Sequence, residues 1–552
     1  PGTAQPGSLA AAPPTPTLGS SNTVTADPPV PRPRTTPCTV ELFSNFTFAD
    51  FSPKPFTYAP PSSCPGPWAK VVLEADFSVT AGRQFDRTAQ IAIGHANVYY
   101  GTTAEPSRTL SPAWHVERDL TDYSPLFTSV QAGDVNLGNL VNSTFTGVLA
   151  GSARLLFYPV SDDEPAPRTA DLVLSLSDAP GGAALLATTA SILAPSLSLP
   201  ANIESAYLDV ITQSQSGDEF WYTCVPNDVA AQLGSCPGTA FREAEVTVDG
   251  QPAGFAPVYP WIFTGGIDPF LWRPIPGVQT LNFVPYRVDL TPFAGVLSNG
   301  RPHQVGISVF NANNYFLVTG SLLLYLDRGA HQVTGAVTLD TLGATLKPSI
   351  KENLTTAADG SITGSVTTGS ARRSTVAGYV DTSHGRVETT VRQDVEFSNV
   401  QQFVSTATRF VQNITQKTTV AAATVTRRED SISFASKELS YPLTVDISFV
   451  VNADGSSAQT TTIGQAFDRQ EARLGSGFPL FDIVANAVAS TDTLLFDAAG
   501  AFTGVSNRNS SQTYSSFSSD RGCYSRSLAS ANGVLTSVVD GKGCGGDHGH
   551  DR

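Results

Sequence analysis

Residues 441–451 read Tyr-Pro-Leu-Thr-Val-Asp-Ile-Ser-Phe-Val-Val, so apolar and polar side chains alternate along this stretch. One face of it collects the apolar residues Leu443, Val445, Ile447, Phe449 and Val451. A period of two is typical of a β-strand that buries one face. This stretch therefore predicts a half-buried strand.

Similar short alternating runs, such as residues 386–391, occur along the chain from Cys38 onward and are separated by Gly, Pro, Asn and Asp. Apolar residues at helical spacing are rare, and residues 400–412 are the best candidate for an amphipathic helix. Many short strands at regular spacing predict an all-β protein built of sandwiches or barrels.

The composition limits the classes of function. The chain has 552 residues, 41% of them hydrophobic, and a formal net charge of −15. Charged residues make up 15%, whereas about 25% is usual in soluble domains. An acidic chain lacks the basic surface that nucleic acids and anionic membranes require, and no apolar run approaches the roughly 20 residues of a membrane helix. We therefore expect neither nucleic acid nor membrane as a partner.

The six cysteines form three couples that are close in sequence. Six cysteines allow 15 pairings, and the pairing with the shortest loops is Cys38–Cys64, Cys224–Cys236 and Cys523–Cys544. Disulfides form in oxidising compartments, so we expect a secreted, extracellular or periplasmic protein. Methionine is absent, so we also expect that a secretory signal was removed before Pro1.

A faint internal repeat divides the chain. Three segments recur in the same order. Leu73-Glu74 followed by Gly82-Arg83-Gln84-Phe85 recurs as Leu208-Asp209 followed by Gly217-Asp218-Glu219-Phe220. Asp119-Leu120-Thr121 recurs as Asp289-Leu290-Thr291, and Leu155-Leu156-Phe157-Tyr158 as Leu322-Leu323-Leu324-Tyr325. We predict a Pro- and Ala-rich linker or tether over 1–36, two similar β-domains over 37–200 and 201–330, and a third β-rich domain over 331–552. The second copy carries an insertion around residues 259–285.

Two acids are candidates for catalysis. Asp86 is flanked by Arg83 and Arg87, and Glu219 precedes Phe220-Trp221 in an apolar setting that suits a proton donor or a water-activating base. Each is also compatible with a structural role, in an Asp–Arg pair or on an edge strand. The repeat places them at nearly equivalent positions, so two sandwiches packed side by side would bring both acids to one cleft.

The aromatic residues of 259–274, with Trp261 and Trp272, are compatible with sugar stacking or with packing between domains. The seven histidines have no metal-ligand spacing, and phosphate-loop and zinc-protease motifs are absent. We therefore predict no metal and no cofactor.

Several motifs together resemble the peptide N-glycanase A family. They are Pro60-Pro61-Ser62-Ser63-Cys64-Pro65, Gly82-Arg83-Gln84-Phe85-Asp86-Arg87, Thr103-Ala104-Glu105-Pro106, Trp114-His115-Val116-Glu117-Arg118-Asp119-Leu120-Thr121, Leu137-Gly138-Asn139-Leu140, Phe220-Trp221-Tyr222-Thr223-Cys224 and Pro269-Phe270-Leu271-Trp272-Arg273-Pro274-Ile275. The resemblance implies two adjacent jelly-roll sandwiches with the active site between them. It also implies removal of N-glycans from glycopeptides or glycoproteins in acid, by hydrolysis of the asparagine side-chain amide. We expect the protein to act as a monomer.

The resemblance assigns roles residue by residue. It implies that Asp86 and Glu219 are catalytic. The residues predicted to bind substrate or support the site are Arg87, Arg273, Trp221, Trp261, Trp272 and Asn139. A further glutamate of the family falls near Asn139, where this chain has no acid. Two other interpretations remain open: a secreted carbohydrate-binding or adhesin-like protein, and a glycoside hydrolase that uses the same two carboxylates.

Overall fold

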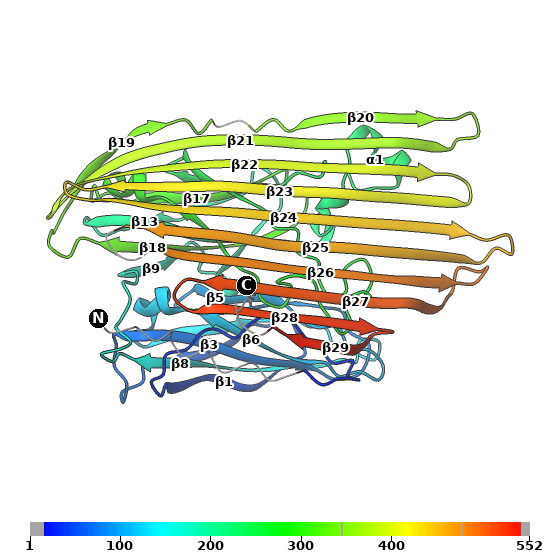
Figure 1. Ribbon diagram of the computed structural model, residues 1–552, viewed down its shortest axis with the longest axis horizontal. Helices are drawn as coiled ribbons and strands as arrows, with labels where there is room; N and C mark the ends of the chain where they lie inside the picture. The colour runs from blue at the N-terminus through cyan, green and yellow to red at the C-terminus, as the bar shows by residue number, and fades with distance from the viewer. Residues whose placement is uncertain (1–15, 344–345, 476–478, 542–552) are drawn as a thin grey trace, which may run out of the picture.

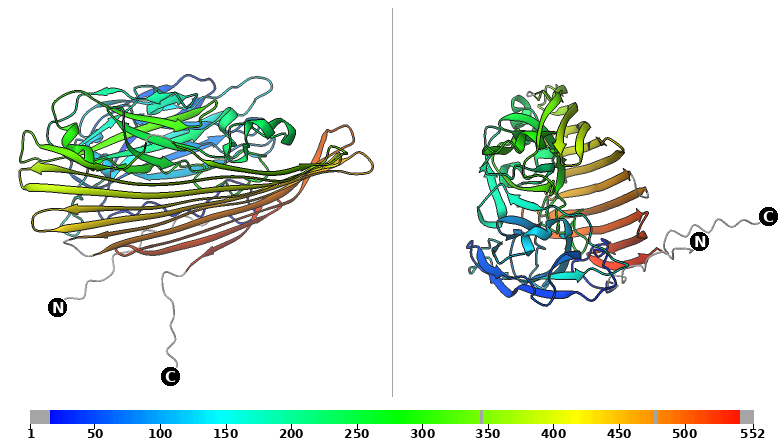
Figure 2. Two further views of the ribbon diagram at one scale, coloured as in Figure 1. Left: turned by 90° about the horizontal axis from the view of Figure 1, so that it is seen from above. Right: turned by 90° about the vertical axis from the view of Figure 1, so that its left-hand side faces the viewer.

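The computed structural model describes residues 16–343, 346–475 and 479–541. These residues form five antiparallel sheets, which make up two β-sandwiches and one long sheet. Both sandwiches lie on the same side of the long sheet (Figures 1 and 2). The predicted fold class, all-β with two adjacent jelly-roll-like sandwiches and a further C-terminal β-rich part, is confirmed.

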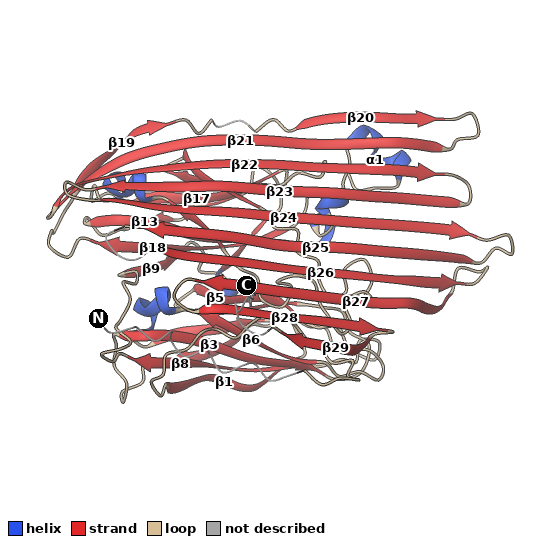
Figure 3. Ribbon diagram, in the orientation of Figure 1, coloured by secondary structure: helices blue, strands red, loops and turns tan. Residues whose placement is uncertain are grey.

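The helices are short segments in the connections between strands (Figure 3). They are α1 (Asn227–Leu233), α2 (Ala294–Leu297) and the 3-10 helices η1 (Thr121–Phe127), η2 (Pro180–Gly182), η3 (Ser216–Asp218), η4 (Trp221–Thr223) and η5 (Thr291–Phe293). Within the described part of the chain, none of them has the length and apolar character needed to cross a membrane.

The first sandwich pairs a sheet of order β1-β8-β3-β6 with a sheet of order β2-β7-β4-β5. Its strands are β1 (Cys38–Phe48), β2 (Lys54–Tyr58), β3 (Trp68–Val79), β4 (Thr88–Ile93), β5 (Ala96–Thr102), β6 (Ala113–Asp119), β7 (Gln131–Asn136) and β8 (Leu149–Pro159). The first strand pairs with the last and the chain crosses repeatedly between the sheets, which is the order of a jelly roll. Alternate residues of β3 fill the space between the sheets: Val71, Leu73, Ala75, Phe77 and Val79.

The second sandwich has the same strand order, but each of its first two strands is divided into two short strands. Its sheets are β10-β18-β13-β16, with β9 also on β18, and β11-β17-β14-β15, with β12 also on β17. The strands are β9 (Leu172–Ser175), β10 (Ala183–Leu186), β11 (Ile192–Leu193), β12 (Ser196–Leu197), β13 (Ile203–Ser214), β14 (Glu243–Val248), β15 (Gln251–Pro257), β16 (Tyr286–Asp289), β17 (His303–Phe310) and β18 (Phe316–Leu326). The predicted division at residue 200 is therefore wrong, because β9 to β12 pair with β17 and β18 of the second sandwich.

The repeated segments occupy equivalent places in the two jelly rolls. Leu73-Glu74 lies on β3 and Leu208-Asp209 on β13, which are the third strands, and the last pair of segments lies on β8 and β18. At the ends of β6 and β16 the aspartate accepts a hydrogen bond from the backbone N–H two residues later, at 3.0 Å in both Asp119–Thr121 and Asp289–Thr291. This turn starts η1 and η5, so the shared Asp-Leu-Thr is a structural signal.

The long sheet has eleven strands in the described residues, in the order β19-β21-β22-β23-β24-β25-β26-β27-β28-β29 with β20 on β21. They are β19 (Thr334–Asp340), β20 (Ser349–Thr356), β21 (Ile362–Thr382), β22 (Gly385–Ser405), β23 (Arg409–Arg427), β24 (Ile432–Val451), β25 (Ser457–Leu474), β26 (Leu480–Phe496), β27 (Phe502–Ser518), β28 (Gly522–Ala531) and β29 (Val534–Asp540). Tyr441, Leu443 and Val445 of β24 share a hydrophobic core with Tyr259 and Trp261 of the second sandwich. The long sheet therefore supports the second sandwich from one side.

The helix expected over residues 400–412 is not formed. This segment ends β22 and begins β23, and Phe403 is buried whereas its neighbour Gln402 is exposed. Valine and other β-branched residues prefer a strand, and the pairing with β21 and β23 satisfies the backbone along the whole of β22.

The N-terminal segment of residues 16–36, called the strap below, is packed, so the prediction of a linker or tether over 1–36 is wrong for this part; residues 1–15 lie outside the described chain. Gly19 pairs with Leu535 of β29 at 2.9 Å, Ala26 is fully buried, and Arg32 reaches the first sandwich. Proline restricts the backbone to an extended form and has no N–H group that would need a hydrogen-bond partner. A Pro-rich segment can therefore pack on the protein through its few polar side chains.

The cysteine predictions have three different outcomes. Cys224 and Cys236 form the predicted disulfide bond. Cys38 and Cys64 are free thiols, so the predicted bond between them is wrong for this structure, although their side chains interact and burial raises the pKa of Cys64 to about 11. The predicted partner of Cys523, Cys544, lies outside the described residues.

Candidate active site

A cavity of about 300 Å³ lies where the two sandwiches meet. The first sandwich contributes Phe51, Asp86, Arg87, Thr88, Thr102, Asn136 and Gly138, the second contributes Gln215, Ser216, Glu219, Tyr315 and Leu317, and the β15–β16 connection contributes Phe263. Asp86 lies between β3 and β4, and Glu219 between β13 and β14. Equivalent connections of the two jelly rolls therefore carry the two predicted acids to one cavity.

The residues on either side of Asp86 are fixed by hydrogen bonds. The buried Gln84 donates from Nε2 to the carbonyls of Leu140 and Gly147, at 2.9 and 3.0 Å, and accepts from Arg87 Nη2 at 3.0 Å. The backbone N–H of Arg87 donates to Thr103 Oγ1 at 2.9 Å, and its carbonyl accepts from the Thr103 N–H at 2.8 Å. These bonds hold Asp86 at the cavity wall.

Burial raises the pKa of Asp86, while a hydrogen bond from the Gly265 N–H and the charge of Arg87 act in the opposite direction. Burial and the negative charge of Asp86 also raise the pKa of Glu219, to about 7. The two acids therefore interact electrostatically across the cavity. A carboxyl with a pKa near 7 holds a proton in acid and can donate it.

Glu219 sits in a short, tightly closed connection. The residue before it, Asp218, is fully buried and accepts backbone N–H bonds from Asn314 and Tyr315, at 2.7 and 2.9 Å. The Cys224–Cys236 disulfide closes the following loop. The side chain of Glu219 is thus presented by a rigid support.

A third acid, Glu105, was missed as a candidate. It follows β5 and lies beside Asp86: a Cβ atom built on Gly265 would lie 2.4 Å from Glu105 Oε2 and 2.7 Å from Asp86 Oδ1. Burial and the charge of Asp86 raise the pKa of Glu105 to about 8. Sequence spacing gave no sign of this contact, and the only available signal was the Thr103-Ala104-Glu105-Pro106 motif itself.

The two predicted arginines have different positions. Arg87 lines the cavity, and its Nε is buried without a hydrogen-bond partner among the described residues. Arg273 is behind the wall: it donates to the carbonyls of Glu105 and Pro106, at 3.2 and 2.6 Å, and its Nη2 lies 3.6 Å from Glu105 Oε1. Arg273 therefore reaches Asp86 through Glu105.

The three predicted tryptophans are buried rather than exposed to a substrate. Trp221 packs against Phe397 of the long sheet, Trp261 packs against Phe283 in a tilted arrangement with ring centroids 4.4 Å apart, and Trp272 Nε1 donates to the Gly266 carbonyl at 2.8 Å. Of the two interpretations of the aromatic loop, packing between domains is therefore the one that describes Trp261 and Trp272.

Exposed aromatic rings do occur beside the cavity, on residues that the sequence did not single out. Phe51 is 64% exposed and lines the cavity, and Phe85, next to Asp86, is 47% exposed. The Phe85 ring lies 5.3 Å from that of Phe145. These rings offer flat apolar surfaces at the entrance to the site.

Asn139 is not at the cavity wall. It is fully buried, and its Nδ2 donates to the Phe48 carbonyl at 3.0 Å while its backbone N–H donates to the Asp50 carbonyl at 2.9 Å. Its neighbour Gly138 lines the cavity instead. Asn139 therefore holds the end of β1 and does not line the cavity.

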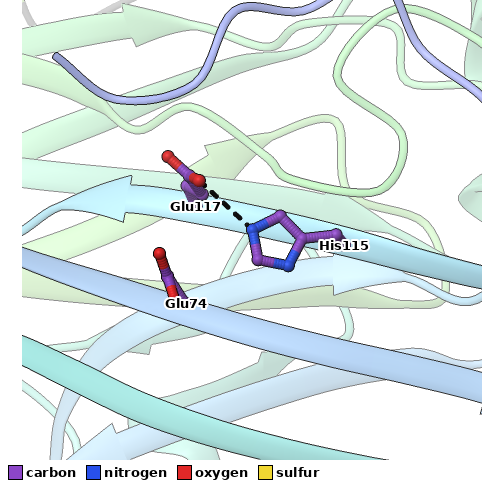
Figure 4. A group of neighbouring side chains, drawn as sticks. All are labelled: Glu74, His115 and Glu117. Atoms are coloured by element: carbon purple, nitrogen blue, oxygen red, sulfur yellow. Dashed lines mark hydrogen bonds and ion pairs between the residues drawn. The ribbon is translucent and has the colours of Figure 1, made fainter. Parts of the chain in front are cut away.

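In the described residues one group of acids and histidine has a geometry compatible with a metal ion: Glu74, His115 and Glu117 (Figure 4). Glu74 and Glu117 are direct cross-strand partners on β3 and β6. Arg32 Nη2 of the strap bonds both carboxylates, at 2.6 and 2.7 Å. Arg154 also pairs with Glu74, at 2.6 Å, so two guanidinium groups already balance the two carboxylates of this group, which lies outside the cavity.

Comparison with known proteins gives the family. The model of the family named peptide N-acetyl-β-D-glucosaminyl asparaginase amidase A matches residues 27–341. The chain is 28% identical over 547 residues to peptide-N4-(N-acetyl-β-glucosaminyl)asparagine amidase A of Prunus dulcis, covering 94% of this chain and 92% of that one.

Two solved structures are similar at low sequence identity. PNGase F from Flavobacterium meningosepticum, described as a glycosylasparaginase, is 11% identical with a TM-score of 0.35, covering 53% of this chain and 96% of that chain. PNGF-II is 13% identical with a TM-score of 0.37, covering 52% and 66%. Since the family match spans more than half of the chain and both of its sandwiches, the chain belongs to the peptide N-acetyl-β-D-glucosaminyl asparaginase amidase A family.

Proposed function

We propose that this protein hydrolyses the amide bond between the innermost N-acetylglucosamine of an N-glycan and the asparagine side chain. The glycan leaves as a glycosylamine, and the asparagine becomes an aspartate. Family membership supports the reaction class. The observation that carries the proposal is that two acids, Asp86 of the first sandwich and Glu219 of the second, line the same cavity.

Amide hydrolysis needs an oriented water, stabilisation of charge on the carbonyl oxygen and a proton for the leaving nitrogen. In the proposed mechanism, ionised Asp86 orients the water and accepts its proton as the water oxygen bonds to the amide carbon. Protonated Glu219 donates its proton to the nitrogen as the carbon–nitrogen bond breaks. Arg87, with an unpartnered Nε at the wall, stabilises the developing negative charge.

The electrostatics of the cavity support these two roles. Glu219, with a pKa raised to about 7, is protonated in mildly acidic solution. Burial raises the pKa of Asp86, but the hydrogen bond from Gly265 and the charge of Arg87 oppose this shift and favour the ionised form. The reaction is therefore expected to proceed in acid, and its rate is expected to fall as the pH rises and Glu219 ionises.

Substrate binding is assigned to the entrance of the cavity. Phe51 and Phe85 expose ring faces that can pack on the apolar faces of sugar rings, and Asn136, Gln215 and Tyr315 offer hydrogen-bonding groups. N-glycosylated peptides or glycoproteins are the proposed partners, with the protein acting as a secreted monomer that requires no cofactor.

The test is digestion of a defined N-glycopeptide at several pH values, followed by mass spectrometry. Wild type should release the glycan and convert asparagine to aspartate, and Asp86→Asn and Glu219→Gln should each lower kcat by about 1000-fold. Glu243→Gln is the matched control, because Glu243 is also buried with a pKa raised to about 7 but pairs with Arg372 away from the cavity. Full activity in Asp86→Asn or Glu219→Gln would remove that residue from the mechanism.

The same digestion separates the alternatives. Release of a reducing sugar with the asparagine unchanged would indicate a glycoside hydrolase. Glycan binding without release would indicate a carbohydrate-binding protein. Either result would overturn the proposed amidase.

A further inference from the structure

The carboxylates of Asp86 and Glu105 form a close pair covered by a single glycine. Gly265, in the connection between β15 and β16, faces Glu105 Oε2 and Asp86 Oδ1 so closely that no side chain fits there. The Gly265 N–H donates to Asp86, and the backbone N–H of Asp86 donates to Glu105. The two carboxylates therefore lie close together, packed against the same glycine.

Only one member of this pair faces the cavity. Asp86 belongs to the cavity wall, whereas Glu105 lies behind it and is held from the far side by Arg273. Thr103, two residues before Glu105, links the connection between β5 and β6 to two others. It pairs with the backbone of Arg87, between β3 and β4, and its carbonyl accepts a hydrogen bond from Thr264 Oγ1, between β15 and β16, at 2.7 Å. Glu105 is thus fixed against the inner side of Asp86.

The charged groups around the pair determine which of the two acids carries the proton. Burial raises the pKa of Asp86, whereas the Gly265 bond and the charge of Arg87 favour its ionised form. Glu105 faces the positive Arg273, but also the negative Asp86 and Asp268, and burial raises its pKa to about 8. Two carboxyl groups this close cannot both ionise readily, so in acidic and neutral solution one proton remains on the pair, and it resides on Glu105.

We propose that Glu105 is a positioning residue that acts through Asp86: as a neutral acid it donates its O–H to the inner oxygen of Asp86 and turns the outer oxygen toward the substrate water. This inference rests on the proposed function, since it assigns Asp86 its orientation for the same reaction. The proton stays on the Glu105–Asp86 pair throughout, and no additional reactant is consumed.

A purely structural Glu105, serving only as a partner of Arg273, makes different predictions. Such a residue would affect folding stability but leave the pH dependence of the reaction unchanged. A proton-holding Glu105 adds a second ionisation to the alkaline limb of the pH–rate profile, beyond that of Glu219. It also lowers the acid-limb pKa, because its hydrogen bond stabilises ionised Asp86.

The experiment compares kcat/KM against pH for wild type, Glu105→Gln and Glu105→Leu on one glycopeptide. The alkaline limb of wild type should approach a slope of −2 on logarithmic axes. Glu105→Gln keeps a donor but cannot ionise, so its kcat at pH 5 should stay within about threefold of wild type while the slope falls to −1. Glu105→Leu loses the donor, so kcat should fall about 100-fold with KM little changed, and the acid limb should move up by about one pH unit.

Several outcomes would overturn the inference. One is an unchanged slope in Glu105→Gln. Another is an equal loss of kcat in the Gln and Leu variants, and a third is an unshifted acid limb in a folded Glu105→Leu protein. If Glu105→Leu does not fold, the slope of the alkaline limb in the isosteric Glu105→Gln variant still tests the inference. Wild type without glycan release would instead refute the proposed function, so the two failures are distinguishable.

Discussion

Asp218 and Arg242 form a completely buried ion pair, with Arg242 Nη2 at 3.1 Å from Asp218 Oδ1 and neither side chain exposed to solvent. Asp218 immediately precedes Glu219, and Arg242 immediately precedes β14. The pair therefore joins the two ends of the connection between β13 and β14, which carries Glu219. Three main-chain N–H groups, of Asn313, Asn314 and Tyr315, complete the bonding of the aspartate.

Replacement of Asp218 by asparagine should lower both stability and activity. Arg242 would keep its charge in a buried site without a counterion, which costs about 3 kcal/mol when one partner of a buried pair is removed. Urea denaturation measures this cost, and glycopeptide digestion measures the effect of a looser Glu219. The control is Asp394→Asn at the exposed pair with Arg373, which should cost less than about 0.5 kcal/mol. Equal costs at the two sites would contradict the anchoring role.

Gly265→Ala should strongly reduce activity without unfolding the protein. The new methyl group would lie within 2.7 Å of both the Glu105 and the Asp86 carboxylates, so the two acids must separate, and we expect a loss of kcat of about 100-fold. Gly504→Ala is the matched control, because a Cβ at Gly504 meets no atom within 4 Å. Digestion rates of the two variants provide the comparison, and a fully active Gly265→Ala protein would show that the acids need not touch.

Phe51→Ala should weaken substrate binding and leave the fold intact. Phe51 is 64% exposed at the cavity, so its loss removes a stacking surface and should raise KM about tenfold. By contrast, Trp272→Ala empties a buried site and should cost about 3–5 kcal/mol of stability. Kinetics with thermal denaturation distinguish the two effects. A raised KM in a fully stable Trp272→Ala protein would instead indicate that Trp272 binds substrate.

Stability should fall as the pH rises from about 4.5 to 8. Burial raises the pKa of Glu105 and Asp492 to about 8 and that of Glu219 to about 7. Each of these groups holds a proton in the folded state that the unfolded chain releases, so its stabilisation is complete below the unfolded pKa and is lost as the pH rises through the folded pKa. Tm measured across this range should fall steadily.

The contribution of one group to this slope can be isolated. Asp492 is fully buried and faces Asp268, with Arg508 nearby. Asp492→Asn removes a titrating group but keeps a hydrogen-bond donor for Asp268, so it should flatten the dependence of Tm on pH. A Tm that is constant or increases between pH 5 and 8 in wild type would show that these carboxyl groups are not buried as described.

Arg32→Gln should destabilise the docking of the strap. Glu74 and Glu117 oppose each other on β3 and β6, and like charges in a direct cross-strand pair repel. Arg32, itself partly exposed, bonds both carboxylates and reduces this repulsion, so its loss should cost about 2 kcal/mol. Arg373→Gln at an exposed pair serves as the control, and limited proteolysis near residue 30 should become faster only in Arg32→Gln. Unchanged proteolysis would show that the strap is held without this bond.

The sequence predicted the strand-rich architecture from short-range patterns. Alternation in residues 441–451 identified a strand because side chains of a strand point to opposite faces in turn. The repeated Asp-Leu-Thr marked the same capped turn in both jelly rolls. The same local reasoning failed over residues 400–412, where apolar residues spaced as in a helix lie in a β-hairpin, because pairing with neighbouring strands overrides local spacing.

The candidate site was predicted in part. Asp86 and Glu219 stood out because each lies beside distinctive residues at equivalent points of the repeat. Trp221, Trp261 and Trp272 were assigned to substrate from residue type alone, but they fill the seams between layers, since a large apolar ring gains most from burial. Asn139 was assigned by position in a motif, and the structure turns its side chain toward the end of β1.

By itself, the sequence determined the all-β class, the duplicated sandwich and the two acids at matching loops, because strand periodicity and turn signals are encoded by neighbouring residues. Only the tertiary structure decided that the Pro-rich strap is packed, that β9 to β12 belong to the second sandwich and that Glu105 lies against Asp86. These features depend on contacts between residues distant in the chain, and burial of acids in a shared space, which sets their pKa values, exists only once the layers are assembled.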